Sequence, residues 1–207
     1  MHRPLALAAL ALLVLARAPA RAGEASYSPD AGEDHPQHVY WGDTHLHTSY
    51  SADATMFGTL RLEPREAFAF ARGRSLVADN GMQARLDRPL DFLVVTDHAE
   101  YLGLLRRVRL GDPAMLAQPS AQRWHEMVQA GGKQAAQAFY EVAISMSSGA
   151  SKPQLLHVPP GEEPPWQRVV AMADEANAPG AFSAFIGFEW TSQPDGDNLH
   201  RVVVFRD

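Results

Sequence analysis

The sequence of 207 residues contains no cysteine. Disulfide bridges, thiolate metal sites, cysteine nucleophiles and the acylated cysteine of a lipoprotein are therefore excluded. Positive charge is also scarce, because 18 Lys and Arg stand against 24 Asp and Glu, and the formal net charge is -6. This balance argues against a nucleic-acid partner. The remaining composition, 46% hydrophobic and 20% charged, is typical of a globular protein of about one domain.

Long apolar runs are scarce as well. The run at 5–16 is shorter than the roughly 20 residues that a membrane span needs. It follows a short basic start and precedes small residues, a pattern that predicts a secretory signal peptide over 1–22 rather than an anchor or a buried helix. Cleavage after Ala20 or Ala22 predicts a periplasmic or secreted protein without stable membrane insertion. The polar segment 23–38, rich in Gly, Pro and acidic residues, predicts a flexible leader.

The rest of the chain alternates β-prone runs with helical patterns. This alternation predicts an α/β fold built from βαβ units. The long segment 101–180 between two strands predicts an insertion, and long insertions often cover a site. We expect strands at 39–41, 91–96, 181–190 and 201–205, and helices at 64–72, at 120–146 with a break at Gly131 and Gly132, and at 165–177.

Histidines and carboxylates accompany the predicted strands at four places. His45 and His47 are two residues apart, so in extended backbone both side chains point to one face and can bind the same metal ion. His98 directly follows an apolar strand, Glu189 ends an apolar run, and His200 follows a polar loop. Because the carboxyl ends of parallel strands meet at one edge of a sheet, these groups are expected to converge. Nitrogen and oxygen ligands without sulfur suit Zn, Mn or Fe.

Each signal also has a less specific interpretation. His45 and His47 alone are equally well explained as a pair of surface histidines. The Asp-His pair that ends in His98 is also explained by an Asp that caps the next helix and a His that bonds to backbone. Glu189 is also explained by a salt bridge to arginine, and His200 by exposure to solvent.

Three segments together resemble the PHP superfamily, named after its polymerase and histidinol phosphatase members. They are YWGDTHLHTSYSAD at 40–53, FLVVTDHAE at 92–100 and GFEWT at 187–191. More narrowly, the chain is similar to an exported branch known as domain-of-unknown-function family 3604, over 40–207. The resemblance implies a distorted (β/α)7 barrel with two or three divalent metal ions at its C-terminal face. It also implies metal-dependent hydrolysis of phosphate esters.

Carried over by position, the resemblance implies that His45 and His47 bind one metal ion. Glu189 would bridge the first two ions, and Asp53 would share a third ion with His98. His200 matches a histidine on the next strand. The implied catalytic groups are Asp97, His98 and Glu189, with Asp97 behind the metal ligands rather than among them.

The superfamily completes its metal sites with a further His and a late Asp-x-His. Only seven residues follow His200. We therefore expect 39–207 to be the N-terminal part of a hydrolase domain, incomplete as a barrel, with the remaining ligands beyond Asp207. The predicted function is a metal-dependent hydrolase, a phosphoesterase acting on a phosphorylated small molecule. The alternatives are hydrolysis of an amide or a sulfate ester, and a non-catalytic metal- or ligand-binding module. Arginines that could hold phosphate by charge are Arg61, Arg65, Arg72, Arg74 and Arg201.

Overall fold

A computed structural model describes residues 38–146, 155–192 and 199–206 of the chain. The predicted signal peptide at 1–22 and, apart from His38, the predicted leader at 23–38 lie outside the described residues. The chain divides into two units, Met1–Val39 and Tyr40–Asp207, and every element with described bounds belongs to the second. Within the described ranges, no helix has the length and apolar character needed to cross a bilayer.

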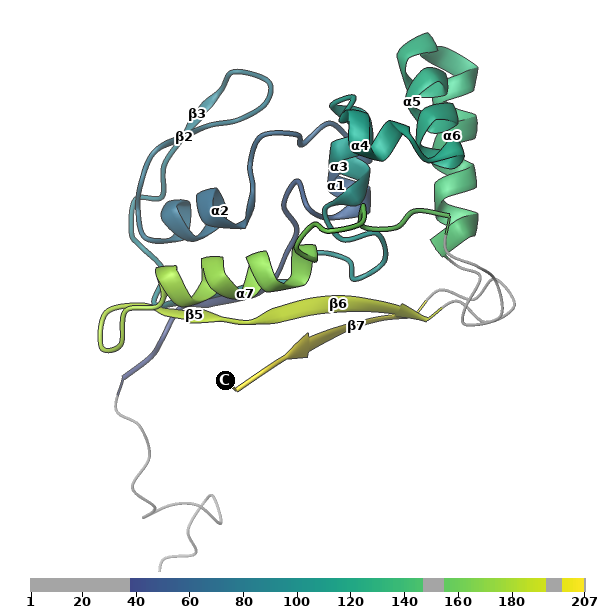
Figure 1. The fold of residues 1–207 in the computed structure, drawn as a ribbon. Helices are drawn as coiled ribbons and strands as arrows, with labels where there is room; N and C mark the ends of the chain where they lie inside the picture. Colours follow the sequence, from purple (N-terminus) through teal and green to yellow (C-terminus); the bar gives the residue numbers. More distant parts are fainter. Residues whose placement is uncertain (1–37, 147–154, 193–198, 207) are drawn as a thin grey trace, which may run out of the picture. The chain divides into compact units, whose positions relative to one another are not determined.

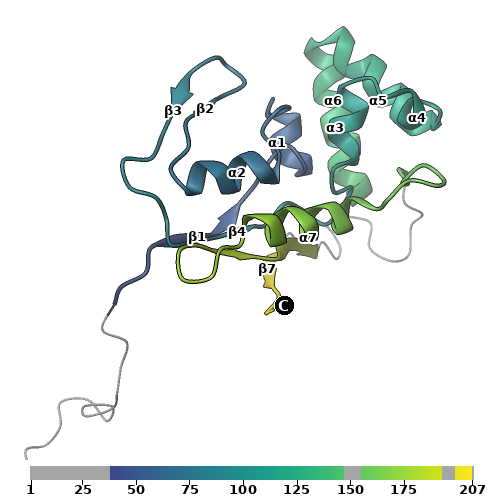
Figure 2. The same cartoon turned by 60° about the vertical axis from the view of Figure 1, so that its left-hand side comes forward.

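Three parallel strands form the central sheet in the order β1-β4-β5. They are β1 (Gly42–Leu46), β4 (Phe92–Val95) and β5 (Ser183–Phe185), and β1 and β4 lie side by side in Figure 2. The register places Phe92 opposite both Gly42 and Ser183. Because the strands are parallel, their carboxyl ends point to the same edge of the sheet.

A second pair of strands, β6 and β7, follows β5 in the chain. After Ile186 the chain enters β6 (Gly187–Ser192), which pairs antiparallel with β7 (Leu199–Val204), as Figure 1 shows. A parallel bridge joins His98 to Glu189. In this bridge the Glu189 N–H donates to the Asp97 carbonyl at 3.1 Å, and the Ala99 N–H donates to the Glu189 carbonyl at 2.9 Å. Strand β6 therefore runs beside the segment that follows β4.

Two glycines allow these backbones to approach closely. A Cβ atom at Gly42 would lie 2.4 Å from the Phe92 side chain. A Cβ atom at Gly187 would lie 2.6 Å from Val94 Cγ1 and 2.9 Å from the Val203 carbonyl oxygen. Both distances are far below ordinary contact, so both positions need glycine.

Two helices cover one face of the sheet. Phe68 of α2 and Ala173 of α7 pack in one buried cluster with Leu93 and Val95, which are alternate residues of β4 and so share a face. Figures 1 and 2 show α2 and α7 on the same side of the strands. Both helices begin with proline, whose missing N–H is not needed at a first helical position. The bounds are α2 (Pro64–Ala71) and α7 (Pro165–Ala176).

The segment predicted as an insertion folds mainly into helices with their own core. Tyr101, Leu105, Trp124 and Val142 are buried in one cluster together with Ala52 of α1. The helices involved are α1 (Ala52–Met56), α3 (Leu104–Arg109), α4 (Pro113–Leu116), α5 (Pro119–Ala130) and α6 (Gly132–Met146). A separate small hairpin is formed by β2 (Leu76–Val77) and β3 (Gln83–Ala84).

The structure confirms the α/β class, with a parallel sheet and helices. The described strands do not close into a barrel, and β6–β7 is antiparallel rather than part of a βαβ unit. The predicted helix break at Gly131 is confirmed. The expected strand at 39–41 is wrong, because pairing with β4 begins only at Gly42. The expected strand at 181–190 divides at Ile186 into β5 and β6, which have different partners.

Candidate metal centre

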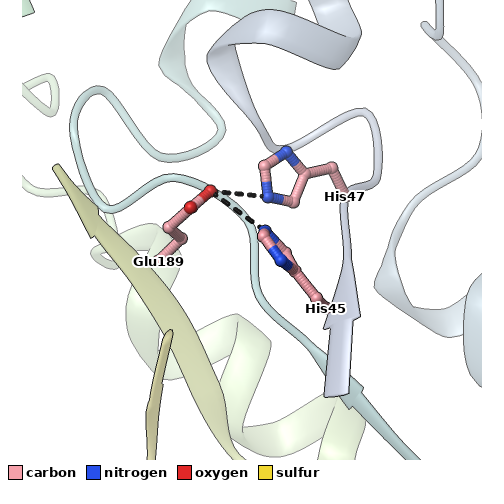
Figure 3. Close-up of side chains that lie close together, drawn as sticks. All are labelled: His45, His47 and Glu189. Atoms are coloured by element: carbon pink, nitrogen blue, oxygen red, sulfur yellow. Dashed lines mark ion pairs between the residues drawn. The ribbon is translucent and has the colours of Figure 1, made fainter. Parts of the chain in front are cut away.

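His45 and His47 lie at the carboxyl end of β1, at the edge where the parallel strands end. His45 lies within β1, and His47 is the first residue after the end of that strand. Their Nε2 atoms both face Glu189 Oε2, at 3.4 Å from His45 and 2.9 Å from His47, as Figure 3 shows. The two histidines therefore point to a common position, as their spacing predicts.

Glu189 lies between the histidines. It is 2% exposed, in β6, and the bridge to His98 fixes its backbone. Its Oε2 is 3.5 Å from His98 Nε2, and its Oε1 is 3.0 Å from His200 Nδ1. Among the described residues its ion pairs are all with histidine and none with arginine. The salt-bridge interpretation of this buried carboxylate thus finds no support in the described part of the chain.

Asp53 joins the group from the first turn of α1. Its Oδ2 lies 2.9 Å from His47 Nδ1 and 3.9 Å from His98 Nε2, and Ser51 Oγ donates to its Oδ1 at 2.6 Å. Burial alone would raise the pKa of Asp53, but the bonds from His47 and Ser51 bring it well below its usual value. Burial alone would lower the pKa of His47, but Asp53 raises it. The opposite shifts of the two pKa values reflect the close pairing of these side chains.

His98 is held so that one ring nitrogen faces the carboxylates. Its Nδ1 lies 2.9 Å from Thr191 Oγ1 and its Nε2 faces Asp53 and Glu189. Burial lowers the pKa of His98 below its ordinary value, which favours the neutral ring. In the tautomer that carries its proton on Nδ1, the Nε2 lone pair points to the carboxylates, as a metal-binding histidine requires.

His200 completes the cluster from a neighbouring strand. It lies in β7 opposite Thr191, and not in a loop, although its side chain is 37% exposed. The antiparallel β6–β7 pairing places it beside Glu189.

Together these residues form three groups, each able to hold a metal ion, whose ligand atoms lie within 4.8 Å of one another. They share His47, His98 and Glu189, so the groups are adjacent rather than separate. They are His45 with His47 and Glu189, His47 with Asp53 and His98, and His98 with Glu189 and His200.

The donor atoms fit divalent metal ions. Two ligands at normal Zn–N or Zn–O distances are separated from each other by about 3 Å, which is the range of the contacts to Glu189. The buried Nε2 of His47 makes no hydrogen bond despite its 2.9 Å approach to Glu189 Oε2. A nitrogen and an oxygen at this distance without hydrogen-bond geometry are placed as ligands of one cation would be. The set contains nitrogen and oxygen donors, as Zn, Mn and Fe sites do.

Asp97 lies next to His98 in the chain but faces another way. Its carboxylate accepts from the backbone N–H of Thr48, and at 2.7 Å from the Thr48 hydroxyl. Burial raises the pKa of Asp97 to about 6. Its contacts fix the residue that follows His47, so the structure places Asp97 behind the metal-ligand groups.

The sequence patterns did not single out three polar residues around the histidines, which are Ser51, Thr191 and Glu100. Ser51 bonds Asp53 and also accepts from the His98 backbone N–H at 3.1 Å. Thr191 contacts His98, and the Thr191 N–H donates to the Glu100 carboxylate at 3.1 Å. Thr191 could have been found from the period-2 pattern, because it is two residues beyond Glu189 and shares its face of β6.

Four of the five arginines considered as phosphate ligands make their described contacts away from this cluster, and the fifth, Arg201, follows His200 in β7 opposite Trp190. Arg65, Arg72 and Arg74 line a different cavity of about 390 Å³ beside α2 and α7, whose walls include no member of the three groups. Arg65 pairs there with Glu175. Arg61 pairs with Asp79.

Fold and site together define a mixed α/β protein with clustered histidines and carboxylates able to hold divalent cations. The chain belongs to the family described as "Protein of unknown function (DUF3604)", whose model matches residues 34–207. This match confirms the resemblance to domain-of-unknown-function family 3604. No match was found among curated proteins or among solved structures.

Proposed function

We propose that this chain is a periplasmic or secreted metal-dependent hydrolase that acts on phosphate esters of small molecules. The observation that carries the proposal is the sharing of His47, His98 and Glu189 among three adjacent ligand groups. Sites with two or three neighbouring metal ions are typical of phosphoester hydrolysis, since paired cations stabilise both the attacking and the leaving oxygen.

The roles of the residues follow from their contacts. Glu189, which reaches histidines with both carboxylate oxygens, would bridge two cations and fix their separation. Asp53 and His98 would hold a further cation, with Ser51 and Thr191 orienting their side chains. Divalent cations bound there supply Lewis acidity toward a phosphoryl group and lower the pKa of water. Asp97 would act by keeping Thr48, and with it His47, in place.

The proposal includes a relation to the PHP superfamily and export from the cytoplasm. The three motifs that contain His45, His98 and Glu189 support the relation, and the described parallel sheet would form part of a PHP-like barrel. The basic, apolar and small-residue pattern of 1–22 supports export. The mass of the protein recovered from the periplasm or the medium tests export, since removal of the signal peptide predicts a chain that starts near Gly23.

Metal content and phosphatase activity of the purified chain test the function. We expect bound Zn, Mn or Fe by elemental analysis, and metal-dependent release of p-nitrophenol from p-nitrophenyl phosphate. His47→Ala should lose metal and activity, because His47 belongs to two of the three groups. His157→Ala is the matched control, because His157 is exposed and belongs to none of them, and it should retain both.

The outcomes separate the candidate functions. Metal binding without turnover of phosphate, sulfate or amide substrates would favour a non-catalytic metal-binding module. Equal metal content in the His47→Ala variant and the unchanged protein would contradict the proposed centre.

A further inference from the structure

A small cavity of about 110 Å³ opens beside the candidate metal centre. One part of its wall consists of Asp53, His98, Thr191 and His200. Three of these are members of the ligand groups, and the fourth orients His98. A molecule in the cavity would therefore be in contact with cations held by the centre.

The remainder of the wall is apolar. Helix α6 contributes Phe139, Val142, Ala143 and Met146, and α1 contributes Met56. The four α6 positions are spaced i, i+3, i+4 and i+7, so they form one continuous face of the helix. Val142 is itself buried in the core of the helical segment, which fixes this face relative to that core.

The cavity wall offers little to a polar alcohol group. Among the described residues that line it, none is Lys, Arg, Asn or Gln, and the polar side chains are those of Asp53, His98, Thr191 and His200 on the metal-centre side. A sugar or nucleoside placed against the α6 face would lose hydrogen bonds of its hydroxyl groups to water without replacing them, which is unfavourable.

We propose that this cavity is the subsite for the alcohol part of the substrate, and that the chain takes phosphate monoesters of small apolar alcohols. This inference rests on the proposed function. The phosphate would lie at the cations, and the carbon chain against Val142, Ala143 and Met146. A cavity of about 150 Å³ holds benzene, so the smaller cavity here suits about three or four carbon atoms. Hydrolysis consumes one water, whose oxygen bonds to phosphorus as the bond between phosphorus and the ester oxygen breaks. A proton from that water goes to the leaving ester oxygen, so the products are inorganic phosphate and the neutral alcohol.

Binding of alkylphosphonates tests the inference without turnover. These probes keep the charged head and cannot be hydrolysed at a P–O ester bond. Calorimetry on the metal-loaded protein with methyl- to hexylphosphonate should show a Kd that falls about three- to four-fold with each added methylene. The gain should end near propyl or butyl, where the cavity is filled. Methyl, propyl and glycerol phosphates, compared by kcat/KM, should rank propyl first.

A pair of variants on the same helix locates the effect. Ala143→Leu fills the cavity, so it should abolish the gain with chain length while metal content and methylphosphonate binding persist. Ala136→Leu is the matched control, because Ala136 is an exposed α6 residue outside this cavity, and it should leave the gain intact. Circular dichroism establishes that both variants fold. The phosphonate series on the unchanged protein remains decisive if Ala143→Leu does not fold.

The possible results test the apolar subsite and the proposed phosphoesterase function separately. Methylphosphonate binding with a Kd that does not change with chain length would overturn the apolar subsite and leave the phosphoesterase proposal standing. If the metal-loaded protein binds neither methylphosphonate nor inorganic phosphate, the phosphoesterase proposal is overturned, and the proposed subsite with it.

Discussion

Glu189 is the residue on which the candidate centre depends most. It places a carboxylate, 2% exposed, in contact with four imidazoles. Two of them lie in strands β1 and β7, and the other two lie in the segments that follow β1 and β4. A buried carboxylate is stable only with strong partners. Here the partners are histidines of groups that could hold a metal ion, and Glu189 belongs to two of these three groups.

Glu189→Gln is predicted to weaken metal binding by at least about 100-fold, because groups that only support metal ligands already account for changes of 10- to 100-fold. The amide keeps the size of the side chain but removes its charge. Competition with a chelator of known affinity measures the effect. Glu162→Gln, at an exposed residue paired with Arg107, should leave metal affinity unchanged. Equal affinities in both variants would contradict the assignment of Glu189.

Asp97 is predicted to act through the position of Thr48. Asp97→Asn replaces one carboxylate oxygen, which accepts a hydrogen bond from Thr48, by an NH2 group, which can only donate. One of the two bonds to Thr48 is therefore lost, and the free energy of unfolding should fall by about 1–3 kcal/mol. Thr48→Val removes the hydroxyl, which donates to Asp97 and accepts from the Tyr50 N–H at 3.2 Å. It leaves the bond from the Thr48 backbone N–H to Asp97, so it should cost less. Urea denaturation measures both. A loss of kcat in Asp97→Asn with unchanged stability would show that Asp97 transfers a proton instead.

At the scale of elements, the site depends on how closely β6 approaches β4. The chain that forms β5 next to β4 continues as β6, which bridges to the segment after β4 at His98 and Glu189. Gly187 lies at this change of partner, against Val94 and the Val203 carbonyl. The absence of a side chain at one position thus allows Glu189 to reach the histidines.

Gly187→Ala is predicted to lower the free energy of unfolding by about 1–3 kcal/mol, because the new methyl group overlaps neighbouring atoms. Val94→Ala removes one of the two overlapping groups, Val94 Cγ1. The double variant should therefore be more stable than the sum of the two single effects predicts. Denaturation of all four proteins measures this coupling. Strict additivity would mean that Gly187 does not contact Val94 as described.

At the scale of the whole molecule, cations at the centre would connect segments that are far apart in the chain. The ligand groups come from β1, α1, the segment after β4, and the β6–β7 pair. An ion that binds only when these segments are assembled stabilises the folded state over the unfolded chain.

Metal ions are therefore predicted to raise the thermal stability. At a free concentration 100 times Kd, one bound ion adds about 2.7 kcal/mol, which for a chain of this size raises Tm by about 5–10 °C. Scanning calorimetry with Zn or Mn, and again after chelation, measures the shift. His47→Ala should show a much smaller shift, and a full shift in that variant would place the bound ion elsewhere.

The sequence by itself determined the α/β class, the break between α5 and α6, and the identity of the histidines and carboxylates that converge. These features depend on local signals: apolar runs, glycine pairs, and polar side chains at the ends of strands. The PHP relation, export and phosphoesterase activity remain predictions from the sequence. The strand expected at 39–41 was wrong, since β propensity does not show where a partner strand begins.

Only the tertiary structure decided which atoms meet. The β6–β7 pairing places His200 beside Glu189, whereas the residue pattern alone left exposure to solvent open, and Asp97 faces Thr48, although it adjoins His98. The apolar cavity combines α6 with α1 and the β6–β7 pair. Contacts between separate segments depend on register and packing, which local residue patterns do not contain.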